Sequence, residues 1–259
     1  ALQADIVCLQ DELVKAAEVQ QAYMSSSIPN IPGINIETVW KPCNVVSGDV
    51  YDIRQINNDE ISIFIGDSIG HGVSAAMLGM MAIRTLAEHR QINGVTTSPA
   101  ELLHALNVAI CDKDGDAAKF ITAFYAVYNM KTNVLMYCGG GHPSSIITQQ
   151  FGKPTMLDSN GPLLGVFHDA VYENKTIKLE PNSKLVVYSD GFEHLMPESL
   201  EQYPVPHYIQ AIHEIFQSGC HNPLEAITSK ASNSTGHSAD DLTILSMHIG
   251  KELFVKHAA

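Results

Sequence analysis

The spacing of apolar positions changes along the chain, and the first stretch has a helical period. Residues 2–24 carry a seam of mostly apolar side chains spaced alternately four and three apart, which predicts one long helix. The seam positions are Leu2, Ile6, Leu9, Leu13, Ala16, Gln20 and Tyr23. A coiled coil has this a/d spacing, but an amphipathic helix packed on its own domain shows it as well. The sequence leaves both interpretations open.

Beyond Pro32 and Gly33 the pattern changes to that of short strands and turns. Residues 49–56 and 60–67 flank the turn-forming sequence Asn-Asn-Asp, which predicts a β-hairpin. The strand-like segments within residues 120–150 predict an antiparallel meander. The expected strands are 34–42, 49–56, 60–67, 120–129, 134–139, 144–150, 171–180, 183–190 and 240–249.

Two helices are expected in the middle of the chain and further helical stretches near its end. Residues 72–90 are rich in Ala, Met and Leu, and the second helix spans 98–112. Ser98 and Glu101 form a capping pattern at its start. The later stretches fall within 206–232. Because strands joined by short turns favour antiparallel sheets, the predicted fold class is α+β, a layered sandwich rather than a doubly wound sheet.

The composition is that of one large domain with an acidic surface. Hydrophobic residues make up 45% of the 259 residues, which is enough to form a substantial core. The net charge is −13, so nucleic acid and anionic membrane surfaces are poor candidates for partners. No stretch reaches about 18 consecutive uncharged apolar residues, so we expect no membrane contact from this chain.

The cysteines bear on the cellular compartment. They form no CxxC pair and are odd in number, which favours reduced, buried thiols in a cytoplasmic protein. They are Cys8, Cys43, Cys111, Cys138 and Cys220. The chain opens at Ala1 without an initiator methionine, and we expect it to be a fragment of a longer protein.

Aspartates recur at the ends of the predicted strands. Asp49 begins one strand, Asp67 and Asp190 each end one, and Asp240 and Asp241 precede the last. Any one of them alone would usually be a turn former or a helix cap. Several carboxylates brought to one edge of a core repel each other and need a neutralising charge. Hard divalent cations take such oxygen ligands, so the repeated placement favours a metal site.

Six short motifs carry a resemblance to a known family. They are SGDVYD (47–52), GDSIGHGVSAAML (66–78), GGGHP (139–143), GPLLGV (161–166), LVVYSDGFEHL (185–195) and DDLTIL (240–245). Their order resembles that of bacterial metal-dependent protein phosphatases of the PPM type. The most similar branch is the SpoIIE/RsbU-like one, related to eukaryotic protein phosphatase type 2C. The resemblance extends from about residue 18 to about residue 249.

The resemblance implies a fold and a set of ligands. The fold is a four-layer α-β-β-α sandwich of two antiparallel sheets flanked by helices, with two Mn²⁺ or Mg²⁺ ions at one end. Asp67 bridges the ions, the backbone carbonyl of Ser68 binds one of them, and Asp67 and Asp190 are the implied catalytic residues. Asp241 shares or substitutes for the role of its neighbour. The implied ligand set is Asp49, Asp67, Ser68, Asp190, Asp240 and Asp241.

Two positions depart from the usual motifs. Ser47 stands where glycine is more frequent, and Ser68-Ile69 stands where valine followed by serine is usual. Neither change removes a carboxylate. The resemblance therefore still implies an active enzyme, and no further cofactor is expected.

The resemblance also implies a reaction and partners. The ions activate a water that attacks the phosphorus of a phosphoserine or phosphothreonine, so no cysteine nucleophile is needed. The usual substrate is a phosphorylated anti-anti-sigma (STAS) regulator. We expect residues 1–27 to form a linker or dimerisation helix that makes a homodimer, and residues 28–259 to form the phosphatase domain.

Other interpretations remain open. The chain could be a catalytically weak metal-binding module that docks a partner, and Asp67–Gly72 faintly resembles the adenine loop of histidine-kinase-like ATPases. For His71 we favour a structural or supporting role, because hard cations do not seek imidazole. His142 is expected in a turn, with a substrate contact as the alternative. We assign Met77, Met80 and Met81 to core packing.

Overall fold

The computed structural model describes residues 2–25, 28–111, 119–149, 152–195, 207–217, 223–225 and 240–251. Its centre is a pair of five-stranded antiparallel sheets. The first sheet has the order β1 (Ile34–Lys41), β12 (Leu242–Ile249), β11 (Lys184–Tyr188), β8 (Ser145–Thr148) and β9 (Thr155–Leu157). The second has the order β10 (Lys175–Lys178), β7 (Val134–Gly140), β6 (Ile121–Asn129), β3 (Glu60–Ser68) and β2 (Asp49–Gln55). A small hairpin, β4 (Gln91–Ile92) with β5 (Val95–Thr96), follows the first of the central helices.

The alternation of side chains along β11 shows how the layers form. Leu185 and Val187 belong to the large core shared with the second sheet, whereas Val186 and Tyr188 belong to a separate apolar cluster. Successive residues of a strand point to opposite faces, so this strand is buried on both. The first sheet therefore packs against the second on one face and against helices on the other.

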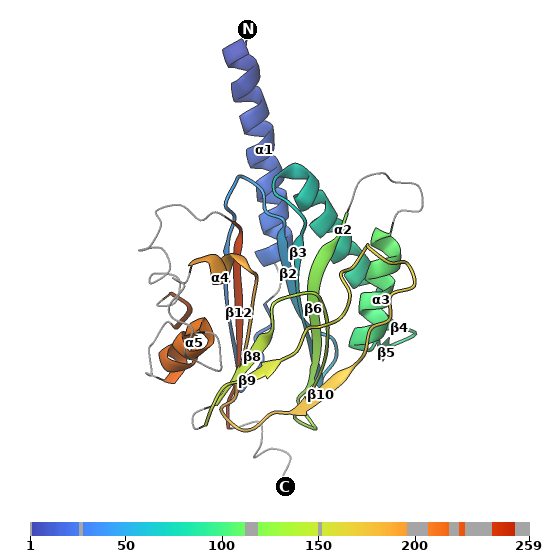
Figure 1. Cartoon of the computed structure of the whole chain (residues 1–259), viewed down its shortest axis with the longest axis vertical. Coiled ribbons are helices and arrows are strands. Elements are labelled where there is room, and N and C mark those ends of the chain that lie inside the picture. Colours follow the sequence, from blue (N-terminus) through green and yellow to red (C-terminus); the bar gives the residue numbers. More distant parts are fainter. Residues whose placement is uncertain are drawn as a thin grey trace.

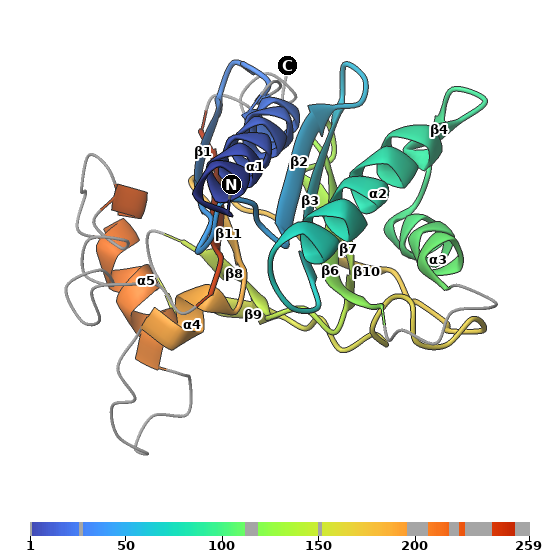
Figure 2. The ribbon, with the colours of Figure 1, turned by 90° about the horizontal axis from the view of Figure 1, so that it is seen from above.

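Helices cover both outer faces, as Figures 1 and 2 show. On the second sheet, α2 (Val73–His89) and α3 (Pro99–Ile110) pack side by side. On the first sheet, α4 (Gly191–Leu195) and α5 (His207–Gln217) close the smaller apolar cluster. The capping box predicted from Ser98 and Glu101 is present at the start of α3. The predicted α+β sandwich of two antiparallel sheets between helices is confirmed.

The N-terminal helix α1 (Leu2–Ser25) has two different halves. Its first half projects beyond the rest of the molecule in Figure 1, and Ile6 and Leu9 are 48% and 61% exposed. Its last turns dock onto the sandwich, where Gln20 is 3% exposed and Met24 is in the core. The seam inferred from the sequence therefore serves the chain's own domain at one end and faces solvent at the other.

The predicted meander between residues 120 and 150 is wrong in its third strand. β6 and β7 pair as expected, but β8 leaves them and pairs with β9 and β11 in the first sheet. The place beside β7 is taken by β10, which comes later in the chain. Periodicity identifies a strand but not its neighbour, because register and pairing depend on contacts between distant segments.

The strand predictions over 49–56, 60–67 and 240–249 agree with β2, β3 and β12, so the strand ends that carry the aspartates were placed correctly. Of the helical stretches expected in 206–232, α5 and residues 223–225 are seen, and the remainder lies outside the described residues. No helix in the described part of the chain is long and apolar enough to cross a membrane.

Candidate metal centre

The second sheet supplies a row of polar side chains at one end. Asp49 of β2 lies directly opposite Asp67 of β3, and Asp67 lies directly opposite Thr122 of β6. Residues paired across antiparallel strands share a face, with their Cβ atoms roughly 5 Å apart. The hairpin predicted from the sequence therefore brings two carboxylates together, next to a hydroxyl.

The first sheet supplies the other carboxylates. Asp190 follows the end of β11, and Asp240 and Asp241 precede the start of the neighbouring strand β12. All of them act on Asp67: its burial, and then the charges of Asp49, Asp190, Asp240 and Asp241, raise the pKa of Asp67 to about 8. The five aspartates predicted to converge thus lie at one end of the sandwich, although they come from both sheets.

Asp49 forms the floor of this cluster. It is 1% exposed, and one of its carboxylate oxygens accepts hydrogen bonds from Ser189 Oγ at 2.7 Å and Thr243 Oγ1 at 2.6 Å. Burial raises the pKa of Asp49 to about 7, aided by the charges of Asp241 and Asp190 and opposed by the two hydroxyls. These hydrogen bonds join the second sheet to the first.

Asp241 is held by backbone amides. One of its carboxylate oxygens accepts the N–H of Cys43 and the other that of Gly48, both at 2.7 Å. The side chain is 4% exposed. This carboxylate therefore ties the segment between β1 and β2 to β12, and that segment leads directly into Asp49. Both of its oxygens therefore have backbone donors, whereas Asp240 accepts the N–H of Asp241 on its Oδ1 at 2.9 Å.

Asp67 is not a helix cap. The N-cap residue of α2 is Gly72, and no side chain caps that helix. In the described part of the chain no donor hydrogen-bonds the Asp67 carboxylate, which is surrounded instead by like charges. Gly70 and Gly72 both have positive φ, so the loop after Asp67 turns in a conformation that suits glycine. The carboxylate points into the cluster without a structural partner.

Ser68 lies against the loop that precedes Asp49. Its backbone N–H donates to the carbonyl of Gly48 at 3.3 Å. A Cβ added to Gly48 would approach the Ser68 carbonyl oxygen to 3.1 Å, so that carbonyl lies close beside the glycine. Glycine at this position of the SGD motif therefore lets the two backbone segments come together at the cluster.

The donor set fits hard divalent cations. Carboxylate and carbonyl oxygens are the ligands that Mg²⁺ and Mn²⁺ prefer, and the mutual repulsion of the aspartates is what bound cations would relieve. One ligand atom each from Cys43, Asp240 and Asp241 lie within 4.8 Å of one another. Burial, followed by the nearby Asp241 and Asp240, raises the pKa of the Cys43 thiol to about 11. A protonated thiol is a poor ligand, so the oxygens are the better candidates.

Three residues at this site were missed by sequence reasoning. Ser189 directly precedes Asp190 in YSDG, and Thr243 follows Asp241 by two residues in DDLT, and this proximity to an aspartate was the available signal. Cys43 had no signal, because it belongs to no metal-ligand spacing. The four cysteines in the described residues are all free thiols, and Cys220 lies outside those residues.

The two histidines considered from the sequence differ in location. His71 is exposed in the loop after Asp67. His142 is 5% exposed and lies 2.9 Å from Thr122 Oγ1 through its Nδ1 atom. His142 lies in the connection between β7 and β8, as the turn interpretation expects, but its ring is buried, which does not favour the alternative of a direct substrate contact.

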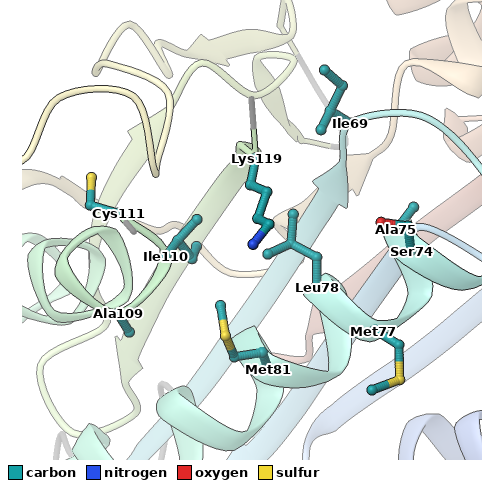
Figure 3. A pocket seen from close by; sticks show the side chains of 10 residues that line it. All are labelled: Ile69, Ser74, Ala75, Met77, Leu78, Met81, Ala109, Ile110, Cys111 and Lys119. Carbon is teal, nitrogen blue, oxygen red and sulfur yellow. The ribbon is translucent and has the colours of Figure 1, made fainter. Parts of the chain in front are cut away.

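A cavity of about 960 Å³ is lined in part by Ile69, which follows Asp67 by two residues in the chain. Figure 3 shows side chains of α2, α3 and the segments beside them around it. Met81 is 37% exposed and Met77 66%, so their assignment to the core is wrong. Met80, between them, packs against the core as expected. The lining is Ile69, Ser74, Ala75, Met77, Leu78, Met81, Ala109, Ile110, Cys111 and Lys119.

Comparison with known proteins gives the chain its family. A family model described as "Stage II sporulation protein E (SpoIIE)" matches residues 57–250. Phosphoserine phosphatase RsbU of Bacillus subtilis (strain 168) is 30% identical over 192 residues, covering 74% of this chain and 56% of RsbU. The chain spans 32% to 56% of the length of the curated relatives it matches.

Two solved structures share the fold. The SiaA-PP2C domain of Pseudomonas aeruginosa superposes with a TM-score of 0.78 at 23% identity, covering 96% of this chain and 98% of that one. RsbX in complex with magnesium superposes with a TM-score of 0.64 at 17% identity, covering 86% of this chain and 99% of RsbX. The family model covers most of the chain and the fold agrees with it, so the chain belongs to the SpoIIE family, as its motif order predicts.

Proposed function

We propose that this chain is a Mn²⁺- or Mg²⁺-dependent phosphatase that hydrolyses phosphoserine or phosphothreonine on a regulatory protein. The observation that carries the proposal is the convergence of five aspartates from both sheets around Asp67, whose pKa their charges help to raise to about 8. RsbU is named a phosphoserine phosphatase, and RsbX was solved in complex with magnesium. Both relationships support the same chemistry here.

The proposed ligands are Asp67, the Ser68 carbonyl, Asp190 and Asp240. Asp67 occupies the centre of the cluster and is the candidate for bridging two cations. When bound, the cations supply a water of lowered pKa and neutralise charge on the phosphoryl group. Asp67 and Asp190 would fix the positions of the ions relative to each other, since they come from different sheets.

Asp49 and Asp241 have supporting roles in this proposal. The hydroxyls of Ser189 and Thr243 hold one oxygen of Asp49, which leaves the other oxygen to face the ions directly or through water. Asp241 uses both oxygens on backbone amides, so we assign it to holding the loop before Asp49 and assign the ligand role to Asp240. The sequence left both aspartates of this pair open as ligands, and the backbone donors to Asp241 support choosing Asp240.

The proposed substrate is a phosphorylated STAS-type regulator in a cytoplasmic partner-switching pathway. The acidic net charge of −13 agrees with a protein partner rather than nucleic acid. We also propose that the exposed first half of α1, with Ile6 and Leu9 on its surface, pairs with a second copy. In this scheme residues 1–27 are the dimerisation helix and residues 28–259 the phosphatase domain.

The test is phosphate release from p-nitrophenyl phosphate and from a phosphorylated STAS protein, with Mn²⁺ and with EDTA. We expect hydrolysis of both in Mn²⁺ and none in EDTA. Asp169→Asn, a change at an exposed aspartate, is the matched control and should behave as wild type. A folded chain that binds Mn²⁺ and hydrolyses neither compound would contradict the proposal and favour the docking module.

A further inference from the structure

The segment GGGHP passes from one sheet to the other. β7 ends at Gly140 in the second sheet, and β8 begins at Ser145 in the first. A Cβ at Gly139 would collide with Ser159, and one at Gly140 with Leu164. At Gly139 the collision includes the Ser159 backbone, so glycine is required there. The next side chain after these glycines is that of His142, which lies between the two sheets.

His142 is enclosed on all sides. It is 5% exposed, and its Nδ1 atom lies 2.9 Å from the hydroxyl of Thr122. Its Nε2 atom is buried and has no hydrogen-bond partner among the described residues, and the backbone of Tyr188 lies near enough to the ring to influence its pKa. Burial lowers the pKa of His142 to about 3, opposed by that backbone, so the ring is neutral.

The surroundings select a tautomer. A neutral imidazole has one nitrogen that donates and one that accepts. Because Nδ1 lies beside the Thr122 hydroxyl, Nε2 is the nitrogen left to face the Tyr188 backbone. A backbone carbonyl can only accept, so we assign the hydrogen to Nε2 and the acceptor role toward Thr122 to Nδ1. The ring therefore lies between polar groups of both sheets: it contacts Thr122 in β6 and lies near the backbone of Tyr188 in β11.

Both partners lie next to proposed metal ligands. Thr122 is directly opposite Asp67 in the β3–β6 register, on the same face of the second sheet. Tyr188 is the last residue of β11, and Asp190 follows closely after it. The imidazole therefore lies between Thr122, the neighbour of Asp67, and Tyr188, which precedes Asp190 by two residues.

We infer that His142 is a positioning residue for the metal centre, holding Asp67 of the second sheet and Asp190 of the first at the separation that two cations require. The inference rests on the proposed metal centre, but not on hydrolysis. His142 touches neither ion nor substrate and acts through Thr122 and the end of β11. Loss of this link is therefore expected to lower the affinity for the cations directly, and to affect hydrolysis only through that loss of affinity.

The experiment compares Thr122→Val with Thr122→Ser by isothermal titration of Mn²⁺ into metal-free protein. Valine keeps the shape of threonine and removes the hydroxyl, whereas serine keeps the hydroxyl. Loss of a group that orients a ligand typically weakens metal binding roughly 10- to 100-fold. We expect that loss for Thr122→Val and near-wild-type affinity for Thr122→Ser.

The chain contains a matched control for the stability effect. Thr148 Oγ1 lies 2.6 Å from Nδ1 of His213, in a second buried threonine–histidine pair between β8 and α5. Thr148 pairs with Lys184 at the start of β11, the opposite end of that strand from Asp190. Thr148→Val removes the same kind of hydrogen bond and should lower the melting temperature without changing Mn²⁺ affinity.

The outcomes separate the inference from the proposed function. If Thr122→Val and Thr148→Val lower the melting temperature alike and both bind Mn²⁺ as wild type does, the His142 link is only structural and the inference fails. It also fails if serine does not restore the affinity. If wild type binds Mn²⁺ without hydrolysing phosphoprotein, the function fails while the affinity comparison still stands. His142→Ala should weaken Mn²⁺ binding at least as much as Thr122→Val, and if it does not fold, the Thr122 pair decides.

Discussion

Asp67 and Asp241 are both strand-end carboxylates at the same end of the sandwich, yet their surroundings are opposite. Asp241 accepts two backbone N–H groups at 2.7 Å, one on each oxygen. Asp67 has no such donor among the described residues, and the charges around it, together with burial, raise its pKa to about 8. One carboxylate is satisfied by the fold, and the other is satisfied only by something added to it.

The difference shows how a cluster of like charges can be built without unfolding the domain. Asp241 and Asp49 form an anchored floor with amide and hydroxyl donors, whereas Asp67 faces the space above it. Hydrogen bonds from the fold offset part of the cost of burying an anchored carboxylate, although burial still raises the pKa of Asp49 to about 7. An unanchored one costs stability until a cation arrives. The following predictions test this division.

Asp67→Asn should have the largest effect on activity. Removing the proposed bridging carboxylate should lower kcat/KM for p-nitrophenyl phosphate on the order of 10³-fold or more, because charge stabilisation by the ions is lost. The same change should raise the melting temperature in EDTA above pH 8, where the wild-type carboxylate is ionised and repelled. Activity within a few-fold of wild type would contradict the two-cation scheme.

Asp241→Asn should instead destabilise the protein, even in EDTA. An asparagine offers one acceptor oxygen and turns an N–H₂ group toward a backbone N–H, so one buried amide loses its partner. The expected cost is about 2 kcal/mol in the free energy of unfolding, measured by urea denaturation. If Asp67→Asn stabilises the metal-free protein and Asp241→Asn destabilises it, the comparison is confirmed. If both changes shift the stability in the same direction, the comparison is wrong.

The stability of the metal-free protein should fall as pH rises from about 4 to about 8. The pKa values of Asp49 and Asp67 are raised from 3.8 to about 7 and about 8 in the folded chain. Between those limits the folded state binds more protons than the unfolded state, so each rise in pH favours unfolding. Urea midpoints measured in EDTA across this pH range test how stability changes with pH, and saturating Mn²⁺ should make that dependence smaller. A slope of the other sign would show that the carboxylates are paired without metal.

Gln20→Ala should have the smallest effect. The Gln20 side chain donates to the Ser47 carbonyl at 2.7 Å and accepts the Ser47 N–H at 3.0 Å, so it pins α1 to the loop before Asp49. Its loss should cost about 1 kcal/mol in the free energy of unfolding, measured by urea denaturation, with little loss of activity.

Removal of residues 1–16 keeps the contact between Gln20 and Ser47, and it should abolish the proposed dimer, measured as mass by light scattering. An unchanged mass would remove the coiled-coil hypothesis.

The sequence alone determined most of the long elements and pointed to the strand-end carboxylates, although it did not indicate the short strands β4, β5 and β9. Residues 49–56 and 60–67 formed the expected hairpin, because alternating side chains around a turn are a local signal. That hairpin placed Asp49 opposite Asp67 without any tertiary information. The order of six motifs also identified the family, since each preserves a turn or a carboxylate at a strand end.

Only the tertiary structure decided which carboxylates are anchored and which face the site. Asp240 and Asp241 are adjacent in the chain, yet the donors to Asp241 come from Cys43 and Gly48, at the other end of the sequence. Likewise β8 left its predicted neighbour for the first sheet, and the connection that carries His142 became buried, which the sequence did not indicate. Periodicity reports the face on which a side chain lies, whereas hydrogen-bond partners and strand neighbours are set when distant segments pack together, so they cannot be read from local pattern.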